Sequence, residues 1–160
     1  MKTLLLTLIT SLFLPAAAAG AEAIVSAGPY DETAVGETQL TEALARARPT
    51  GKRVLLVFGA NWCADCRAMD ALFKANVEIS AQLAAGFELV KIDVGHDEVP
   101  RKNAALIKRF GVAMETGIPV LVVADAQGKP LNDTKKERLA DTDHRDPAKV
   151  LSFLKQWAKQ

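Results

Sequence analysis

Cysteine and histidine, the soft metal ligands, are scarce in this chain of 160 residues, which contains two of each. A zinc site normally needs four protein ligands, or three and a water molecule. His96 and His144 stand far apart in polar, turn-like stretches with no second ligand at a useful spacing, so surface positions are expected for both. Covalent haem attachment requires histidine directly after the second cysteine, and Arg67 stands there instead. The sequence therefore predicts no metal centre.

The chain also lacks a dominant charge and a glycine-rich loop. Its 20 basic and 19 acidic residues give a formal net charge of +1, whereas proteins that bind nucleic acid usually carry a strongly basic face. No glycine-rich phosphate-binding motif is present. We expect neither a nucleic acid partner nor a nucleotide or flavin cofactor.

Long hydrophobic runs are absent after the first 21 residues. An apolar run at residues 4–14 follows Lys2 and precedes several small residues, which is the pattern of a secretory signal peptide. A retained membrane anchor would need about 20 apolar residues, and Pro15 interrupts this run. We predict a signal peptide over residues 1–21 and an exported mature chain without a membrane span, in an oxidising environment where disulfides persist.

The remaining chain has the size of one domain. Residues 22–36 show no sustained period and are predicted to be a linker, followed by a single domain over residues 37–160. Apolar residues at helical spacing alternate there with short apolar runs that are typical of buried strands. Helices are predicted at residues 40–47, 63–85 with a break near 76, 103–110 and 146–157; strands are predicted at 54–58, 87–94 and 118–123, with a hairpin turn at 125–129 and a short strand after it.

Proline and glycine mark the predicted helix ends. Pro49 and Gly51 are predicted to end the first helix, and Asp146 followed by Pro147 is a favourable start for the last one. The buried stripe of the last helix is predicted to consist of Val150, Leu151, Leu154 and Trp157.

Both cysteines belong to one motif, Trp62-Cys63-Ala64-Asp65-Cys66, which follows a buried strand and opens a helix. The unpaired N–H groups of a helix start favour a thiolate, and the thiolate is the nucleophilic form. Cys63 is therefore predicted to attack and to be the only accessible thiol. Cys66 lies one turn further on the same face, where it can close a disulfide and release a bound partner. A structural disulfide is the alternative, although so short a loop constrains the unfolded chain little.

With Gly117-Ile118-Pro119 at a later strand start, this motif resembles that of the thioredoxin superfamily, and more narrowly that of exported bacterial thioredoxin-like proteins. The resemblance implies an α/β thioredoxin fold, in which helices flank a central mixed β-sheet. It also implies a periplasmic location.

The resemblance assigns a role to each matching residue. Cys63 matches the nucleophilic cysteine, Cys66 the resolving cysteine and Trp62 the tryptophan that flanks the site. Pro119 matches a cis-proline that lies against the disulfide; the residues alone could not assign this, because only about 5–6% of X–Pro bonds are cis. The backbone of Ile118 is expected to pair with an extended substrate peptide, as a strand adds to a sheet edge.

The sequence departs from thioredoxin at three points. The residues between the cysteines are Ala64 and Asp65 rather than glycine and proline. Val57 stands where thioredoxin has a buried aspartate that moves the proton of the resolving thiol. Residues 113–116 lengthen the approach to the predicted cis-proline. Glu115 could replace the missing carboxylate, but most such loop acids are exposed to solvent.

Asp65 is predicted to tune the redox chemistry. A carboxylate between two sulfurs disfavours a neighbouring thiolate, and the adjacent Arg67 is expected to offset part of this effect. A less stabilised thiolate makes the dithiol couple more reducing. Alternatively, Asp65 is only a first-turn acid that suits the helix dipole.

Two hypotheses for the function follow from these residues. The first is an exported thiol–disulfide oxidoreductase that reduces disulfides of proteins or peptides and receives electrons from an unidentified thiol donor, without metal, flavin or nucleotide. The second is a redox-gated binding module or periplasmic chaperone, with a metallochaperone as a variant, in which the cysteine pair controls partner affinity.

Overall fold

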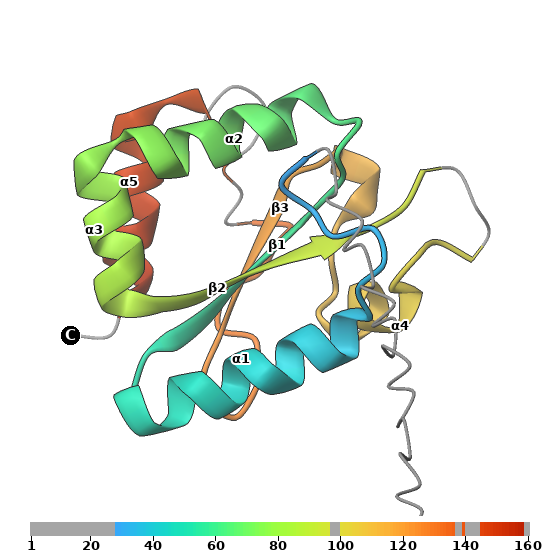
Figure 1. The fold of residues 1–160 in the computed structure, drawn as a ribbon, viewed down its shortest axis with the longest axis horizontal. Helices are drawn as coiled ribbons and strands as arrows, with labels where there is room; N and C mark the ends of the chain where they lie inside the picture. The colour runs from blue at the N-terminus through green and yellow to red at the C-terminus, as the bar shows by residue number, and fades with distance from the viewer. Residues whose placement is uncertain (1–27, 97–99, 137–138, 140–144, 159–160) are drawn as a thin grey trace, which may run out of the picture.

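The computed structural model describes residues 28–96, 100–136, 139 and 145–158 (Figure 1). The predicted signal peptide, the beginning of the predicted linker and His144 lie outside these residues. Within them, no helix combines the length and the apolar composition that crossing a membrane requires. The elements are, in chain order, α1 (Gly36–Thr50), β1 (Arg53–Gly59), α2 (Ala64–Ala75), α3 (Val77–Gly86), β2 (Phe87–Asp93), α4 (Ala104–Arg109), the 3-10 turn η1 (Met114–Thr116), β3 (Val120–Ala124) and α5 (Pro147–Trp157).

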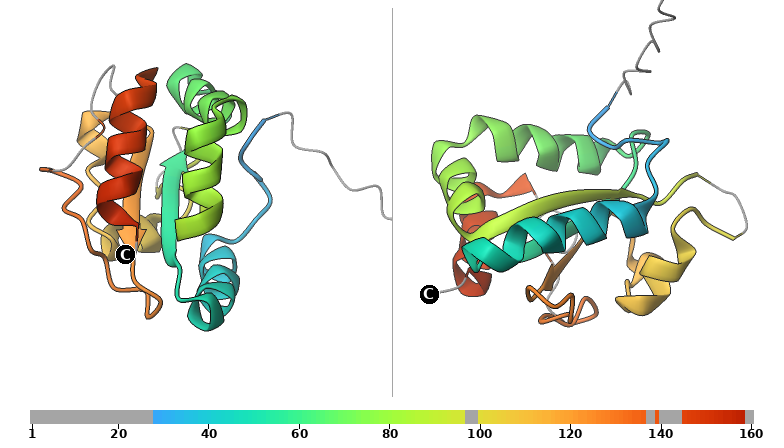
Figure 2. Two further views of the ribbon diagram at one scale, coloured as in Figure 1. Left: turned by 90° about the vertical axis from the view of Figure 1, so that its left-hand side faces the viewer. Right: turned by 60° about the horizontal axis from the view of Figure 1, so that its bottom comes forward.

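The strands form one mixed sheet in the order β2-β1-β3. The central strand β1 pairs in parallel with β2, where Leu56 lies opposite Val90, and antiparallel with β3, where Leu56 lies opposite Val122. Helices α1 and α2 cover opposite faces of this sheet, and α3 stands beside α5 at one end (Figures 1 and 2). The predicted α/β fold with a mixed sheet between helices is confirmed.

Alternating side chains of β1 divide the core into two clusters, one on each face of the sheet. Val54, Leu56 and Phe58 are buried among side chains from α1 and α4. Leu55 and Val57 point the other way and are buried among side chains from α2, α3 and α5. A strand that is covered on both faces needs an uninterrupted apolar sequence, which is the pattern that predicted β1.

Capping residues define the helix ends. Helix α1 continues past Pro49, where it was predicted to stop, and ends at Gly51, whose φ of 69° is left-handed. Asn76 ends α2 and caps α3, because its Oδ1 accepts a hydrogen bond from the Ile79 N–H at 3.1 Å. The predicted break near residue 76 is therefore confirmed. Helix α5 begins at the predicted Asp146 cap.

The buried stripe of α5 differs from the prediction. Val150 and Leu154 are fully buried, as predicted, and Phe153 takes the third buried place. Leu151 and Trp157 are only half-buried. The stripe therefore follows the i, i+3, i+4 pattern from Val150. Leu151 and Trp157 lie at the sides of this stripe.

The outer edge of β3 is closed by a side chain. After the predicted turn the chain makes only an isolated bridge to β3, so the short strand predicted there is not formed. Asn132, which is 7% exposed, accepts a hydrogen bond from the Val123 N–H at 2.8 Å and donates one to the Leu121 carbonyl at 3.0 Å. One amide side chain thus satisfies two backbone groups that a further strand would otherwise pair.

We predict that Asn132→Ala lowers the free energy of unfolding by about 2 kcal/mol, because two buried backbone groups lose their partners. Urea denaturation followed by circular dichroism measures the change. Gln127→Ala is the control, since Gln127 is exposed in the preceding turn and should leave the stability unchanged. An Asn132→Ala protein as stable as the wild type would mean that water or a neighbouring strand closes this edge.

Candidate functional site

The two cysteines lie where α2 begins, directly after the carboxyl end of β1. Cys63 is the N-cap residue of α2, and its N–H donates to the Ala60 carbonyl at 3.2 Å. The Sγ of Cys63 accepts a hydrogen bond from the Cys66 N–H at 3.2 Å. That amide is one of the donors that a helix start leaves without an intrahelical partner. The helix start therefore holds the first sulfur in the way that the motif predicted.

Both thiols are free and largely buried. Cys63 is 7% exposed and Cys66 is 1% exposed, so the order agrees with the prediction but Cys63 is more covered than predicted. The cover includes Ile118, whose carbonyl oxygen lies 3.5 Å from the Cys63 Sγ. The peptide bond between Ile118 and Pro119 is cis, as the resemblance implied.

The buried position of Cys66 controls its ionisation. Burial raises the pKa of the Cys66 thiol to about 12, and the neighbouring Cys63 thiol adds to the rise. Hydrogen bonds with the Ala60 backbone and the Tyr30 side chain act in the opposite direction without cancelling it. Cys66 therefore keeps its proton at neutral pH in the reduced protein.

Tyr30 belongs to this site although the sequence did not single it out. It precedes α1, inside the stretch predicted as a linker, yet it is 1% exposed and packs in the cluster beneath α2. Its hydroxyl lies beside the Cys66 sulfur, since both atoms border the same point next to Gly59, and it acts to lower the pKa of the Cys66 thiol. Burial, followed by the charge on Cys66, raises the pKa of the Tyr30 hydroxyl far above its usual range, so the group stays protonated. The one available signal was a large aromatic side chain, the single tyrosine of the chain, in an otherwise irregular segment.

Asn61 fixes the segment that carries Tyr30. Its Oδ1 accepts a hydrogen bond from the Tyr30 N–H at 2.9 Å, and its Nδ2 donates to the Tyr30 carbonyl at 2.8 Å. Gly59 provides the space for the side chain: a Cβ at this position would lie 2.2 Å from the Tyr30 Oη and 2.8 Å from the Cys66 Sγ. The contact between hydroxyl and thiol therefore depends on a glycine at the end of β1.

Trp62 lies on the surface beside the cysteines and is 50% exposed. Its Nε1 donates to the Gly95 carbonyl at 2.9 Å, and its ring centroid lies 5.0 Å from that of His96. These contacts anchor the indole to the loop after β2. His96 is exposed, as predicted, but its contact with Trp62 had no signal in the sequence.

Asp65 forms an ion pair with Arg145, the residue before the Asp146 cap of α5. Arg67 was predicted to offset the charge of Asp65, but it donates from Nη1 to the Asn61 carbonyl. The cation that faces Asp65 therefore comes from a distant part of the chain, which the motif could not reveal.

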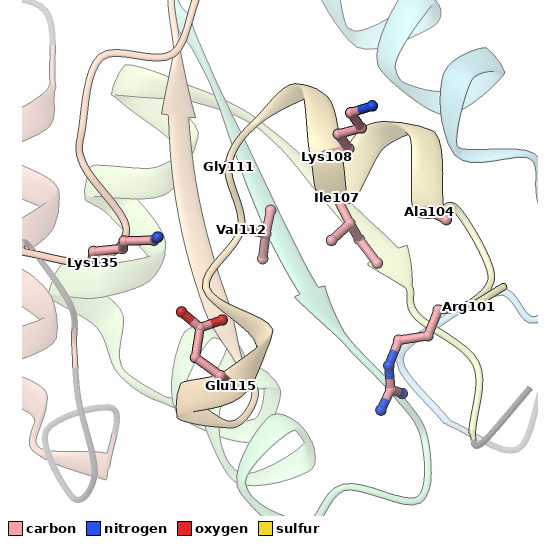
Figure 3. A pocket seen from close by; sticks show the side chains of 8 residues that line it. All are labelled: Arg101, Ala104, Ile107, Lys108, Gly111, Val112, Glu115 and Lys135. Atoms are coloured by element: carbon pink, nitrogen blue, oxygen red, sulfur yellow. The ribbon is translucent and has the colours of Figure 1, made fainter. Parts of the chain in front are cut away.

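Glu115, the acidic residue in the loop before β3, lies away from the cysteines. Glu115 lines a pocket of about 410 Å³ whose lining residues come from α4, η1 and the segment around Lys135, and do not include the cysteines. Figure 3 shows the Glu115 carboxylate on the same side of the pocket as the Lys135 ammonium.

Val57 is buried at 3% exposure in the apolar cluster of the sheet. No group of three or more potential metal ligands occurs in the part of the chain that the structure describes.

The sequence matches the thioredoxin-like family over residues 36–127, a range that begins after Tyr30. Among solved structures, the chain is similar to the disulphide isomerase from Xylella fastidiosa Temecula1, with 40% identity and a TM-score of 0.71 over 81% of this chain and 95% of that one. The C-terminal domain of DsbD from Neisseria meningitidis shares the fold at 21% identity and a TM-score of 0.50, over 76% of this chain and 95% of that domain.

Among curated proteins, the chain is 35% identical over 91 residues to the thiol:disulfide interchange protein DsbD of Ralstonia nicotianae. It is 30% identical over 98 residues to the protein of the same name from Vibrio cholerae. The matches cover 57% and 61% of this chain, but only 14% and 15% of those much longer relatives.

We predict that Gly59→Ala lowers the free energy of unfolding by about 1–3 kcal/mol, the usual cost of adding a methyl group to a packed interior. Thermal and urea denaturation measure this change. Gly86→Ala is the matched control, because its Cβ would meet the Ala158 Cβ at 3.1 Å and no closer atom; it should cost much less. Equal stability of the two variants would show that Tyr30 and Cys66 can move apart without penalty.

Proposed function

This chain belongs to the thioredoxin-like family, and from that membership and its cysteine geometry we propose that it is a thiol–disulfide oxidoreductase. Cys63 and Cys66 form the redox pair of this proposal. The observation that carries it is the pairing of a helix-capping sulfur, held by the Cys66 amide, with a second sulfur buried directly behind it. The names of the similar proteins, disulphide isomerase and thiol:disulfide interchange protein, point to the same chemistry.

The proposed reaction has two exchanges. The Cys63 thiolate attacks a substrate disulfide, so that a mixed disulfide forms and one substrate sulfur leaves as a thiolate. Cys66 then attacks the Cys63 sulfur, the second substrate sulfur leaves, and the chain is left with an intramolecular disulfide. Two electrons pass from the dithiol to the substrate. Because the amide donor at the helix start points at Cys63 and Cys66 retains its proton, Cys63 is the sulfur suited to the first attack.

Trp62, Ile118 and Pro119 are the proposed substrate-binding residues. Ile118 already presents its carbonyl oxygen at 3.5 Å from the Cys63 sulfur, and an extended peptide could pair with this backbone in the manner of an added strand. The exposed Trp62 ring supplies an apolar surface next to it. Proteins or peptides that contain disulfides are therefore the proposed substrates.

The proposal includes reduction as the direction of the reaction and an unidentified thiol as the electron donor. The negative charge of Asp65 disfavours a thiolate at the neighbouring cysteines, and a less stabilised thiolate makes the cysteine pair a stronger reductant. The ion pair between Asp65 and Arg145 reduces this effect of the charge. We further place residues 1–21 in a signal peptide, 22–36 in an N-terminal segment and 37–160 in the thioredoxin-like domain, with the exported chain in the periplasm.

We predict that Cys66→Ala accumulates mixed disulfides with partner proteins that contain disulfides, while Cys63→Ala does not, because only Cys66 can release a partner bound to Cys63. Non-reducing gels and mass spectrometry of the variants after incubation with insulin identify the trapped species. The wild-type protein should reduce insulin in the presence of dithiothreitol, and both variants should lose this turnover. Partner binding that depends on the redox state, without any turnover, would instead favour the redox-gated binding module.

A second prediction concerns the charge next to the cysteines. Arg145→Ala should slow alkylation of Cys63 by iodoacetamide about two- to fivefold at low salt, since an exposed ion pair of this kind contributes up to about 1 kcal/mol. Adding Asp65→Asn to that variant should restore the rate. Lys136→Ala is the control, because Lys136 pairs with Asp133 on a different part of the surface. If Asp65→Asn changes nothing in either background, Asp65 is only a helix-start residue.

A further inference from the structure

We propose that Tyr30 is a positioning residue for the second exchange: its hydroxyl donates a hydrogen bond to the Cys66 sulfur and stabilises the thiolate that must attack Cys63. This inference rests on the function proposed above and deepens it. It assigns a role in the chemistry to a residue that precedes the first helix of the domain.

The geometry places the hydroxyl at the buried sulfur. Tyr30 Oη and Cys66 Sγ both lie within 3 Å of the point where a Gly59 Cβ would stand, at 2.2 and 2.8 Å, so the hydroxyl and the sulfur are direct neighbours. Both side chains are 1% exposed, so water has little access to them. In such a site a single protein donor has a large influence on the charge that the sulfur can carry.

The position of Tyr30 is fixed independently of this contact. Asn61 pairs with both the N–H and the carbonyl of Tyr30, and it directly precedes the Trp-Cys-x-x-Cys motif. The same turn that carries Cys63 therefore also holds the tyrosine. A side chain that served only to fill the core would not need a hydroxyl at this place, because a buried hydroxyl costs free energy unless it is hydrogen-bonded.

The hydroxyl acts as a donor and not as a base. Since burial keeps Tyr30 protonated, it cannot take the proton of Cys66. In the second exchange the Cys66 proton passes to solvent, the Cys66 thiolate attacks the Cys63 sulfur, the Cys63–Cys66 bond forms and the substrate sulfur leaves as a thiolate. Tyr30 keeps its own proton throughout and lowers the energy of the intermediate thiolate by hydrogen bonding.

Reaction of the reduced full-length protein with the aromatic disulfide dithiobis(nitrobenzoate) separates the two exchanges. Each exchange releases one coloured thiolate, so stopped-flow absorbance gives one rate for the attack by Cys63 and one for the attack by Cys66. In Tyr30→Phe we expect the second rate to fall about tenfold or more, the order expected when a charged group loses one hydrogen bond. The first rate should change by less than about twofold.

The pH dependence of the second rate is a further measurement, and a change in core packing alone would not shift it. The ionisable groups that act on the reacting sulfur or on Tyr30 are Cys66 itself, Tyr30, Cys63 and Asp70. Cys63 carries the mixed disulfide at this stage and has no proton to lose, and Asp70 is paired with Lys74 and Lys91. Because Tyr30→Phe leaves the Asp70 pairs in place, the profile should move to higher pH as Cys66 becomes harder to ionise. A profile that keeps its position would contradict the inference.

Thr134→Val is the matched control, because it removes another buried hydroxyl, 3% exposed, that bonds the Ala113 N–H and the Gly111 carbonyl away from the cysteines. It should leave both rates unchanged.

An unchanged second rate in Tyr30→Phe, or an equal loss in both rates, overturns the proposal. If Tyr30→Phe does not fold, Asn61→Ala carries the same test, since it releases the segment without altering the ring. Failure of the insulin assay with both coloured phases intact would refute protein disulfides as the substrates and would leave the Tyr30 result readable.

Discussion

The burial of β1 on both faces determines where every part of the site lies. Its side chains anchor the strand alternately in the two core clusters, and each large apolar side chain buried in this way contributes about 1.5–3 kcal/mol. The carboxyl end of the strand at Gly59 is therefore a fixed point. From there the chain has room for only a short turn before α2 begins, and that turn places Cys63 at the helix start. Cys66 then lies against the cluster that also buries Leu55 and Val57.

The elements that the sequence predicted are those whose signals are local. The apolar run of β1, the Asn76 break between α2 and α3, and the Asp146 cap of α5 each depend on residues within a few positions of one another. The cis bond before Pro119 is different, because it came from a resemblance and not from the residues themselves.

The features that were not predicted depend on contacts between distant segments. Arg145 faces Asp65 from the far end of the chain, and Asn132 closes a sheet edge where a strand was expected. Tyr30 lies in a segment without periodicity, so no pattern marks it as buried. Phe153 was missed because the buried side of α5 was predicted to include Leu151 and Trp157, whereas Phe153 lies there instead. In each case tertiary packing chose among arrangements that the local sequence permits equally well.

The family match begins at residue 36, so Tyr30, the residue beside the buried thiol, lies outside the range that this match covers. Proteins can therefore share the cysteine motif, the cis-proline and the sheet, and still differ in what faces the second sulfur. Such a difference would not be visible in the motif, yet it would separate chains that release their partners quickly from chains that hold them. With the role proposed for Tyr30, an upstream segment would set the lifetime of the mixed disulfide, while the residues that define the family stay the same.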